Sequence, residues 1–150
     1  MRVVLTHTDL RLYWPARIEA FKALAENRGA ILEVVEVAGA GSPYAFAERT
    51  TGWPSWWHVP FPDTRMEDID PRDACAAVFR ELDTIRPDAV LCGAVAFPSG
   101  AAAIRWCSTR RKACVVFDDA RPADVPRSRL TNLVKSIIHR NVGAFIRPGR

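Results

Sequence analysis

The sequence predicts an α/β fold, a Rossmann-like three-layer α/β/α arrangement with a mainly parallel sheet. Short apolar runs typical of buried strands alternate with segments of helical periodicity along the whole chain. A chain of 150 residues that is 49% hydrophobic can bury one core, and it is short for two ordinary domains. We therefore expect residues 1–150 to form a single domain.

The first part of the chain follows a strand, helix, strand pattern. Aliphatic and β-branched residues predict strands at 3–6 and 31–37. Between them, Pro15 is a favourable first residue for a helix and Gly29 is a favourable stop. The loop at 7–11 contains no glycine, so the Gly-x-Gly-x-x-Gly fingerprint of dinucleotide sites is absent there.

Residues 38–70 differ in composition, because glycines and prolines interrupt every potential long element. Trp53, Trp56 and Trp57 fall within five positions of this segment. We expect an ordered loop with a short strand near His58, and loops of this length inside a compact domain are often functional. The tryptophans could cover one edge of the sheet, or they could form an aromatic wall for a sugar ring or a lipid tail.

The second half of the chain continues the alternation. Asp70 and Pro71 suit the cap and the first residue of a helix, which should end at Pro87. Strands are expected at 89–92, 113–117 and 143–146, and helices at about 101–110 and 127–140. One face of the last helix is apolar and is expected to pack inward: Leu130, Leu133, Val134, Ile137 and Ile138.

The charge distribution indicates which partners are possible, and the cysteine spacing indicates which metal or redox sites are possible. The net charge of +4 divides into −3 for residues 1–75 and +7 for residues 76–150. The basic half could attract phosphate or an anionic membrane, or it could be an ordinary solvated face, and we expect no nucleic-acid partner. The cysteines have no paired spacing, which predicts small core residues in a reducing compartment and neither a zinc site nor a redox motif: Cys75, Cys92, Cys107 and Cys114.

No apolar run reaches the length of a membrane span, and no signal peptide is recognisable at the first residues. We expect a cytoplasmic protein without a bound cofactor or metal. Contact with a membrane would then be limited to the protein surface.

Charged residues follow the predicted strands, at the edge where open α/β sheets bind their ligands. Asp118 and Asp119 come directly after the strand at 113–117, where one carboxylate could take a proton from an acceptor hydroxyl or orient it. They could instead form a salt bridge to Arg121 or Arg127 that fixes the bend. Asp118 and Asp119 are the catalytic candidates of this sequence.

Candidate binding residues lie at equivalent positions elsewhere. His7, Asp9 and Arg11 follow the first strand and are expected at the same edge, with a structural role for the histidine as the alternative. Ser99 lies near the start of a helix, where backbone N–H groups could bind a hydroxyl or phosphate, although it could be a plain N-cap.

The last predicted helix has several interpretations. Its basic residues, among them Arg127 and Lys135, could hold a phosphate group or rest on an anionic bilayer. The helix could equally do no more than cover the sheet.

Four short motifs follow one another along the second half of the chain: Pro87-Asp88-Ala89-Val90-Leu91, residues 113–117 with Asp118-Asp119-Ala120-Arg121, Pro126-Arg127-Ser128-Arg129-Leu130 with Lys135, and Val142-Gly143-Ala144-Phe145-Ile146-Arg147-Pro148-Gly149. In this order they resemble the N-terminal half of a GT-B glycosyltransferase of the group 1 (family 4) kind. His7-Thr8-Asp9 with Tyr13 to Arg17, and Gly41-Ser42-Pro43-Tyr44, are similar to the same group more loosely. Position 143 departs from the family pattern, which usually has Asp there.

The resemblance implies a Rossmann-like acceptor-binding domain that faces a second, C-terminal domain holding the nucleotide-sugar donor. Residues implied on the acceptor side are His7, Asp9, Arg11, Tyr44, Ser99 and Arg121. The family's donor motif, a Glu followed seven positions later by another Glu, has no credible copy in residues 1–150. We therefore expect the donor-binding domain to be absent and the chain to be incomplete for catalysis alone, because both substrates must be brought together.

Two functions remain open at this point. The first is the acceptor side of a glycosyltransferase that moves a sugar to a hydroxyl on a small-molecule or lipid-linked acceptor, with peripheral contact to the inner face of the membrane. The second is a non-catalytic module that binds a sugar, a nucleotide or a partner protein. A receiver-type or flavodoxin-like domain is disfavoured, because the paired acidic residues and the flavin phosphate loop are missing. The surface left by an absent second domain could support a homodimer.

Overall fold

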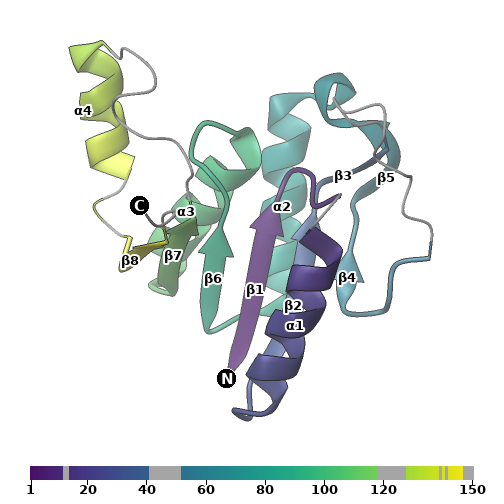
Figure 1. The fold of residues 1–150 in the computed structure, drawn as a ribbon. Helices are drawn as coiled ribbons and strands as arrows, with labels where there is room; N and C mark the ends of the chain where they lie inside the picture. The colour runs from purple at the N-terminus through teal and green to yellow at the C-terminus, as the bar shows by residue number, and fades with distance from the viewer. Residues whose placement is uncertain (12–13, 41–51, 118–127, 139, 141, 147–150) are drawn as a thin grey trace.

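The structure is a computed structural model that describes residues 1–11, 14–40, 52–117, 128–138, 140 and 142–146, without the side chains of residues 129–131. In chain order the elements are β1 (Arg2–His7), α1 (Trp14–Glu26), β2 (Ile31–Glu36), β3 (Ala38–Ala40), β4 (Trp57–His58), β5 (Phe61–Arg65), the 3-10 helix η1 (Met66–Asp68), α2 (Pro71–Ile85), β6 (Ala89–Cys92), α3 (Pro98–Arg110), β7 (Ala113–Phe117), α4 (Arg129–Ile138) and β8 (Ala144–Ile146). Figure 1 shows their arrangement.

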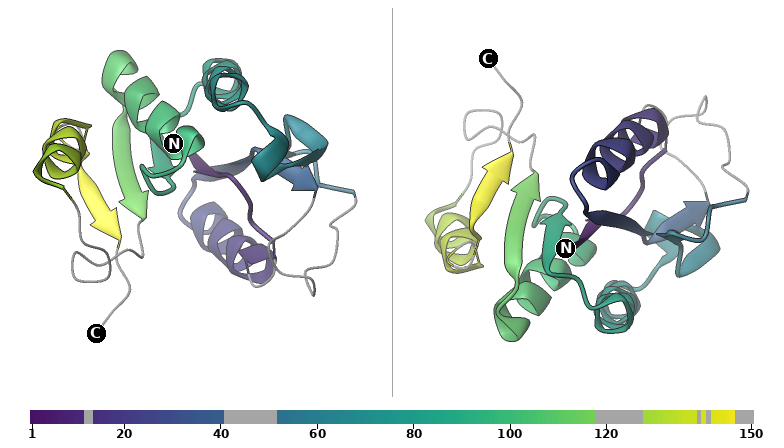
Figure 2. Two further views of the ribbon diagram at one scale, coloured as in Figure 1. Left: turned by 90° about the horizontal axis from the view of Figure 1, so that it is seen from above. Right: turned by 90° about the horizontal axis from the view of Figure 1, so that it is seen from below.

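Six strands form one sheet in the order β4-β2-β1-β6-β7-β8, and every neighbouring pair is parallel. The chain builds outward from β1 to β2 and β4, then returns through α2 to the other side of β1 and adds β6, β7 and β8. Figure 2 shows α1 on one face of the sheet and α2 and α3 on the other. This confirms the three-layer α/β prediction, and it places the reversal of winding between β1 and β6.

The two faces of the sheet bury separate cores, because side chains alternate along each strand. On the α2 and α3 face, Val4 and Val90 are fully buried together with Val78 of α2. On the α1 face, Val34 packs with Ile18 of α1. Each central strand is therefore apolar on both sides, which explains its near-continuous apolar sequence.

The two helices on one face begin at prolines. The Asp70 side chain accepts a hydrogen bond of 2.7 Å from the Arg72 backbone N–H, and Pro71 is the first residue of α2, as predicted. The start predicted for α3, at about Ala101, is wrong by three residues, since α3 begins at Pro98. The fixed φ of proline suits the first helical position.

Residues 38–70 contain more regular structure than the sequence predicted. The expected short strand is present as β4, which pairs with β2 at the edge of the main sheet. In addition, β3 and β5 form a separate two-stranded parallel sheet. A Cβ on Gly39 would lie 2.4 Å from the Pro62 carbonyl oxygen, so the close approach of these strands requires glycine.

The last helix and strand are less buried than the sequence predicted. Leu133, Val134 and Ile137 of α4 are 57%, 48% and 53% exposed, so the prediction that this stripe packs inward is wrong for these three residues. Ile138 does pack against the core of the α3 face. Figures 1 and 2 place α4 beside the β7 and β8 end of the sheet, and β8 is the edge strand of the sheet that the described residues form. Among the described residues, no helix is both long and apolar enough to cross a bilayer.

Candidate functional site

The candidate site lies at the carboxyl ends of β1, β6 and β7, which we call the switch-point edge and define by His7, Thr8, Gly93 and Phe117. The winding of the sheet reverses between β1 and β6, which is the position where open parallel sheets bind ligands. The N-terminus of α3 and the start of α1 lie at the same edge (Figure 1). Three neighbouring strands and two helix N-termini therefore meet there.

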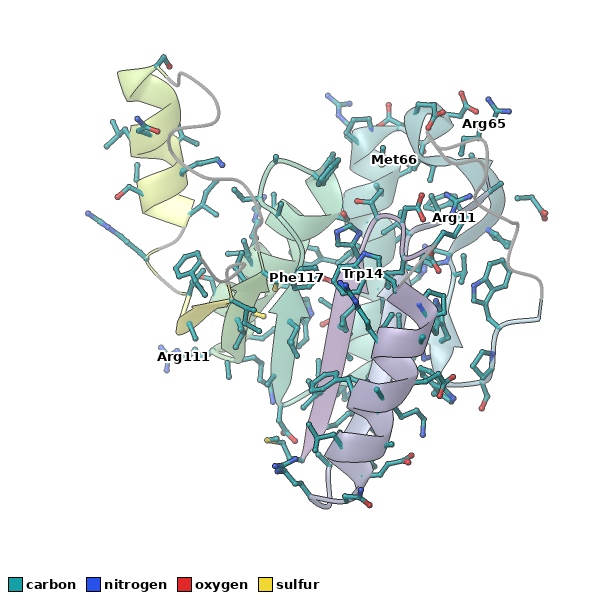
Figure 3. All side chains as sticks on the ribbon, in the orientation of Figure 1. Arg11, Trp14, Arg65, Met66, Arg111 and Phe117 are labelled. Carbon is teal, nitrogen blue, oxygen red and sulfur yellow. The ribbon has the colours of Figure 1, made fainter. Side chains whose placement is uncertain are left out.

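His7 lies within a cluster of aromatic rings. Its imidazole stacks on Phe117, with ring centroids 5.5 Å apart and planes inclined by 15°. The rings of Trp14 and Phe97 lie 6.1 and 6.3 Å from it in tilted orientations. Trp14 also contacts Phe117 at 5.6 Å, and Figure 3 shows these two side chains together. The four rings come from β1, α1, β7 and the residue preceding α3, so the cluster forms only when the chain folds.

Gly93 makes room for the imidazole. A Cβ built on Gly93 would lie 2.9 Å from Cδ2 of His7. Contacts this short do not occur between carbon atoms, so a side chain at position 93 would push the ring away. Because Gly93 directly follows β6, the His7 ring can extend from β1 across the switch point.

The backbone around Asp9 holds the orientation of His7. Nδ1 of the imidazole lies 2.8 Å from the Asp9 carbonyl oxygen and 3.2 Å from the Asp9 backbone nitrogen. The Asp9 backbone N–H donates the longer of these bonds to Nδ1, whereas the shorter contact with the carbonyl oxygen requires a proton on Nδ1. The two contacts therefore belong to different protonation forms of the ring. Both contacts hold the imidazole in place against the loop after β1.

Asp9 and Arg11 bind each other. The Arg11 guanidinium donates from Nε to one Asp9 carboxylate oxygen at 2.8 Å and from Nη2 to the other at 2.6 Å. Arg11 also donates to the Ala40 carbonyl oxygen at 3.3 Å, and its side chain is only 5% exposed. The pair thus ties the loop after β1 to the end of β3, and its proposed contact with an acceptor stays a prediction.

Ser99 connects the loop after β1 to α3. Its hydroxyl lies 2.6 Å from the hydroxyl of Thr8, and both side chains are buried. The interpretation of Ser99 as an N-cap is wrong, because Phe97 occupies the cap and Ser99 lies in the first helical turn. A Cβ on Gly100 would lie 2.3 Å from the Ala94 carbonyl oxygen, so glycine lets this turn approach the loop after β6.

The buried carboxylate of Glu36 binds the backbone of the loop that follows β1. Glu36 is 2% exposed, and it accepts hydrogen bonds from the Leu10 backbone N–H at 2.6 Å and from the Trp57 indole N–H at 2.9 Å. Burial raises the pKa of Glu36 above its ordinary value, and the two hydrogen bonds oppose that rise. Glu36 thus holds the loop that carries Asp9 and Arg11.

The tryptophans of the 52–57 segment match the simpler of the two interpretations. Trp57 is buried, and Trp53 and Trp56 pack against the core on the α1 face. Lys22 of α1 places its ammonium 5.2 Å from the centre of the Trp56 ring. These rings cover the β4 edge of the sheet, away from the cluster around His7.

The structure brings some predicted site residues together and leaves others outside its description. His7, Asp9, Arg11 and Ser99 meet at or beside the switch-point edge, as the sequence predicted for strand ends. Lys135 is half-buried on α4, beyond the β7 side of the sheet and apart from β1 (Figure 1). The other candidates lie outside the described residues: Tyr44, Asp118, Asp119, Arg121 and Arg127.

Sequence reasoning missed the aromatic residues and the glycine that position His7. The sequence patterns place Phe117 only at the end of a strand and Trp14 only within a loosely matching segment, and they give Phe97 no role. The available signal was that a large aromatic residue stands at or just after two strand ends. Which of them share one site depends on strand order, which the sequence pattern does not specify.

Comparison with solved structures identifies the fold. UDP-GlcNAc 2-epimerase from Methanocaldococcus jannaschii is 10% identical, with a TM-score of 0.58 over 99% of this chain and 40% of that one. The enzyme of the same name from Neisseria meningitidis, bound to UDP-GlcNAc, is 9% identical, with a TM-score of 0.59 and the same coverage. The S. aureus MnaA–UDP co-structure is 7% identical, with a TM-score of 0.56 over 98% of this chain and 38% of that one.

These similarities show a Rossmann-like α/β fold, and at such low identity they show the fold alone. This chain spans about 40% of the length of these three structures. No protein-family model matches the sequence, and the search of curated proteins finds no significant match.

Proposed function

We propose that this chain is the sugar-side domain of a nucleotide-sugar enzyme, and that the aromatic cluster around His7 receives the sugar ring. The observation that carries the proposal is the position of this cluster at the β1–β6 reversal of the sheet. The C–H faces of a sugar ring pack well on aromatic side chains, while a few polar groups fix its hydroxyls. The similar structures support the class of ligand, since one is bound to UDP-GlcNAc and another to UDP.

His7 is the group at this edge with acid–base capacity. The Asp9 backbone holds Nδ1 of this imidazole, and we propose that the ring exchanges a proton or a hydrogen bond with a sugar or acceptor hydroxyl. Asp118 and Asp119 follow β7 directly in sequence, and we propose them as the carboxylates that act with His7. Tyr44, Asp9, Arg11, Ser99 and Arg121 complete the proposed acceptor side.

Within this class we favour transfer of the sugar to a hydroxyl acceptor, on the strength of the motifs that resemble family 4 glycosyltransferases. Epimerisation of the sugar is the second candidate, because the similar structures include enzymes of that name. In both cases we propose that a second domain supplies most of the nucleotide contacts, since the similar chains are more than twice as long. This chain alone should bind weakly and turn over nothing.

A lipid-linked acceptor is part of the proposal. Leu133, Val134 and Ile137 are exposed on α4 beside the half-buried Lys135, an apolar and basic combination that suits an anionic bilayer surface. Sedimentation with anionic liposomes should carry the protein down, and Leu133→Asp should leave it in solution. Equal sedimentation with neutral liposomes, or none with either, would refute the membrane contact. A dimer in light scattering that Leu133→Asp dissociates would assign this face to self-association.

Saturation-transfer NMR tests the central proposal, because it detects weak binding. With UDP-GlcNAc, the protons of the sugar ring should receive saturation from the protein, and free UDP should receive less. His7→Ala should reduce the sugar signal at least several-fold. His58→Ala is the matched control, because this half-buried histidine lies on β4 and is bound to Glu33 at 2.8 Å, away from the site.

Each result separates one part of the proposal from the others. Saturation confined to the uridine protons would overturn the sugar-side assignment. No saturation of any nucleotide sugar, with the fold intact by circular dichroism, would refute binding and favour a module for a partner protein. Turnover of a nucleotide sugar by this chain alone would refute the requirement for a second domain.

A further inference from the structure

Three cysteines far apart in the sequence meet inside the α3 face of the sheet. Cys92 ends β6, Cys114 is the second residue of β7, and Cys107 lies on α3, which packs over both strands. Their exposed fractions are 0%, 2% and 1%. We call these three residues the thiol cluster. The sequence spacing gave no sign of it, because strand pairing and the crossover helix create the proximity.

The sulfur atoms are close to the spacing that one metal ion imposes. All three Sγ atoms lie within 4.8 Å of one another, and those of Cys92 and Cys114 are 3.6 Å apart. Sulfur ligands about 2.3 Å from a tetrahedral ion are about 3.8 Å from each other. The cluster would therefore need to contract by about 1 Å at most, which side-chain rotation can supply.

The surroundings also contain a polar atom without a partner. Thr6 is fully buried, and its hydroxyl makes no hydrogen bond to any residue that the structure describes. Thr6 is the register partner of Cys92 on the adjacent strand. Buried polar atoms are normally satisfied, and those that are not call for an explanation such as an ion at the site. A hydroxyl on the strand next to Cys92 could donate a hydrogen bond to the Cys92 thiolate of a metal-bound cluster.

Two thiols of the cluster, those of Cys92 and Cys107, have raised pKa values and stay protonated without an ion. Hydrogen bonding with Cys114 raises the pKa of Cys107 to about 12, and hydrogen bonding with its two neighbours, together with burial, raises the pKa of Cys92. Buried thiolates without a counter-charge are therefore excluded at neutral pH. An ion that enters the cluster must displace the three protons, which its own charge makes possible.

We propose that Cys92, Cys107 and Cys114 form a binding site for a soft divalent metal ion of the Zn²⁺ and Cd²⁺ type. Thiolate ligands select soft ions over Mg²⁺ or Ca²⁺. Three thiolates carry a charge of −3, so a divalent ion leaves −1 in the core whereas Cu⁺ would leave −2, and the smaller residual charge costs less to bury. Binding releases three protons for each ion and forms three metal–sulfur bonds without oxidation. The site is independent of the sugar proposal, because it lies within the core of the opposite sheet face from His7.

Refolding of the reduced protein with Cd²⁺ tests this site, since refolding removes the barrier to entry into a closed core. One Cd²⁺ per chain should remain after dialysis, with thiolate-to-cadmium charge-transfer absorption in the ultraviolet and three protons released. Cys107→Ala should weaken Cd²⁺ binding by at least about tenfold, as expected for loss of a ligand. Cys75→Ala is the control and should leave binding unchanged, because Cys75 lies outside the cluster and contacts the Pro98 carbonyl oxygen.

Alkylation of the cysteines provides a second measurement. It uses the protein without substitutions, so no variant that fails to fold can affect the result. Bound Cd²⁺ should slow the labelling of Cys92, Cys107 and Cys114 by at least about tenfold and leave the rate at Cys75 as it was. Absence of charge-transfer absorption from the fully reduced protein would overturn the proposal. An equal loss of binding in Cys75→Ala, or protection of Cys75 alone, would overturn it as well.

Discussion

Thr8 and Ser99 form a hydrogen bond between two buried hydroxyls, 2.6 Å apart and 91 positions distant in the sequence. The bond joins the loop after β1 to the first turn of α3, and so it helps to fix the switch-point edge. Thr8→Val keeps the shape of the side chain and removes its hydroxyl. The Ser99 hydroxyl, on a residue that is 2% exposed, then loses this partner without gaining access to water.

The expected cost follows from that loss. A buried hydroxyl left without a partner costs about 1–3 kcal/mol, whereas removal of both partners is close to neutral. For a domain of this size, a loss of 2 kcal/mol lowers the melting temperature by about 4–8 °C. Thr8→Val should therefore be clearly destabilised, and Ser99→Ala similarly so. The double variant should be more stable than the sum of the two single losses predicts, by about 1 kcal/mol or more.

Urea unfolding followed by circular dichroism measures this coupling for the two single variants and the double variant. Thr84→Val is the matched control, because the Thr84 hydroxyl donates to the Arg80 carbonyl oxygen on the exposed surface of α2. It should change stability by less than about 0.5 kcal/mol. Strictly additive losses for Thr8 and Ser99 would refute the hydrogen bond, and with it the physical link between β1 and α3.

Three further outcomes follow from single residues. Gly100→Ala should lower the free energy of unfolding in urea by about 1–3 kcal/mol, because its Cβ would lie 2.3 Å from a backbone oxygen. Gly143→Ala is the control and should lower it less, because the corresponding contact is 3.5 Å. Equal losses in the two variants would contradict this explanation. Arg111→Gly should raise the free energy of unfolding by up to about 1 kcal/mol, because the C-cap of α3 has a left-handed φ of 54°, which glycine adopts without strain. A less stable Arg111→Gly variant would contradict this prediction. The raised pKa of Glu36 means that the native state binds its proton more tightly than the unfolded state does. Its contribution to stability should therefore be present below pH 4.5 and decline as pH rises through the raised native value, and the unfolding free energy of Glu36→Gln should lack that decline.

The sequence anticipated the strand ends of the candidate site but not what surrounds them. The sequence predicts one edge for His7, Asp9, Arg11 and Ser99, because the carboxyl ends of parallel strands and the N-termini of the helices that follow them lie at the same edge of a sheet. Trp14, Phe97 and Phe117 were missed, because their meeting depends on β6 and β7 lying on one side of β1 while β2 lies on the other. Only that order places aromatic side chains from three separate segments around the imidazole.

For the α4 helix, the sequence predicted the secondary structure but not the tertiary contacts. Its apolar periodicity correctly predicted a helix, but it did not predict burial, because periodicity reports which residues share a face and not what covers that face. Leu133 and Ile137 remain exposed at the end of the sheet. The thiol cluster was invisible for a related reason, since no spacing rule connects a residue of β6 with one on α3 and another on β7.

By itself, the sequence determined the class of fold: alternating apolar strands and amphipathic helices can bury their faces only as helices packed on a parallel sheet. It also set the helix limits where proline or a capping side chain acts locally, as Asp70 and Pro71 do for α2. The tertiary structure alone decided the partners of His7, Ser99 and Cys107. The physical reason is distance along the chain: local propensities act over a few residues, whereas these contacts join segments that meet only after the strands have paired.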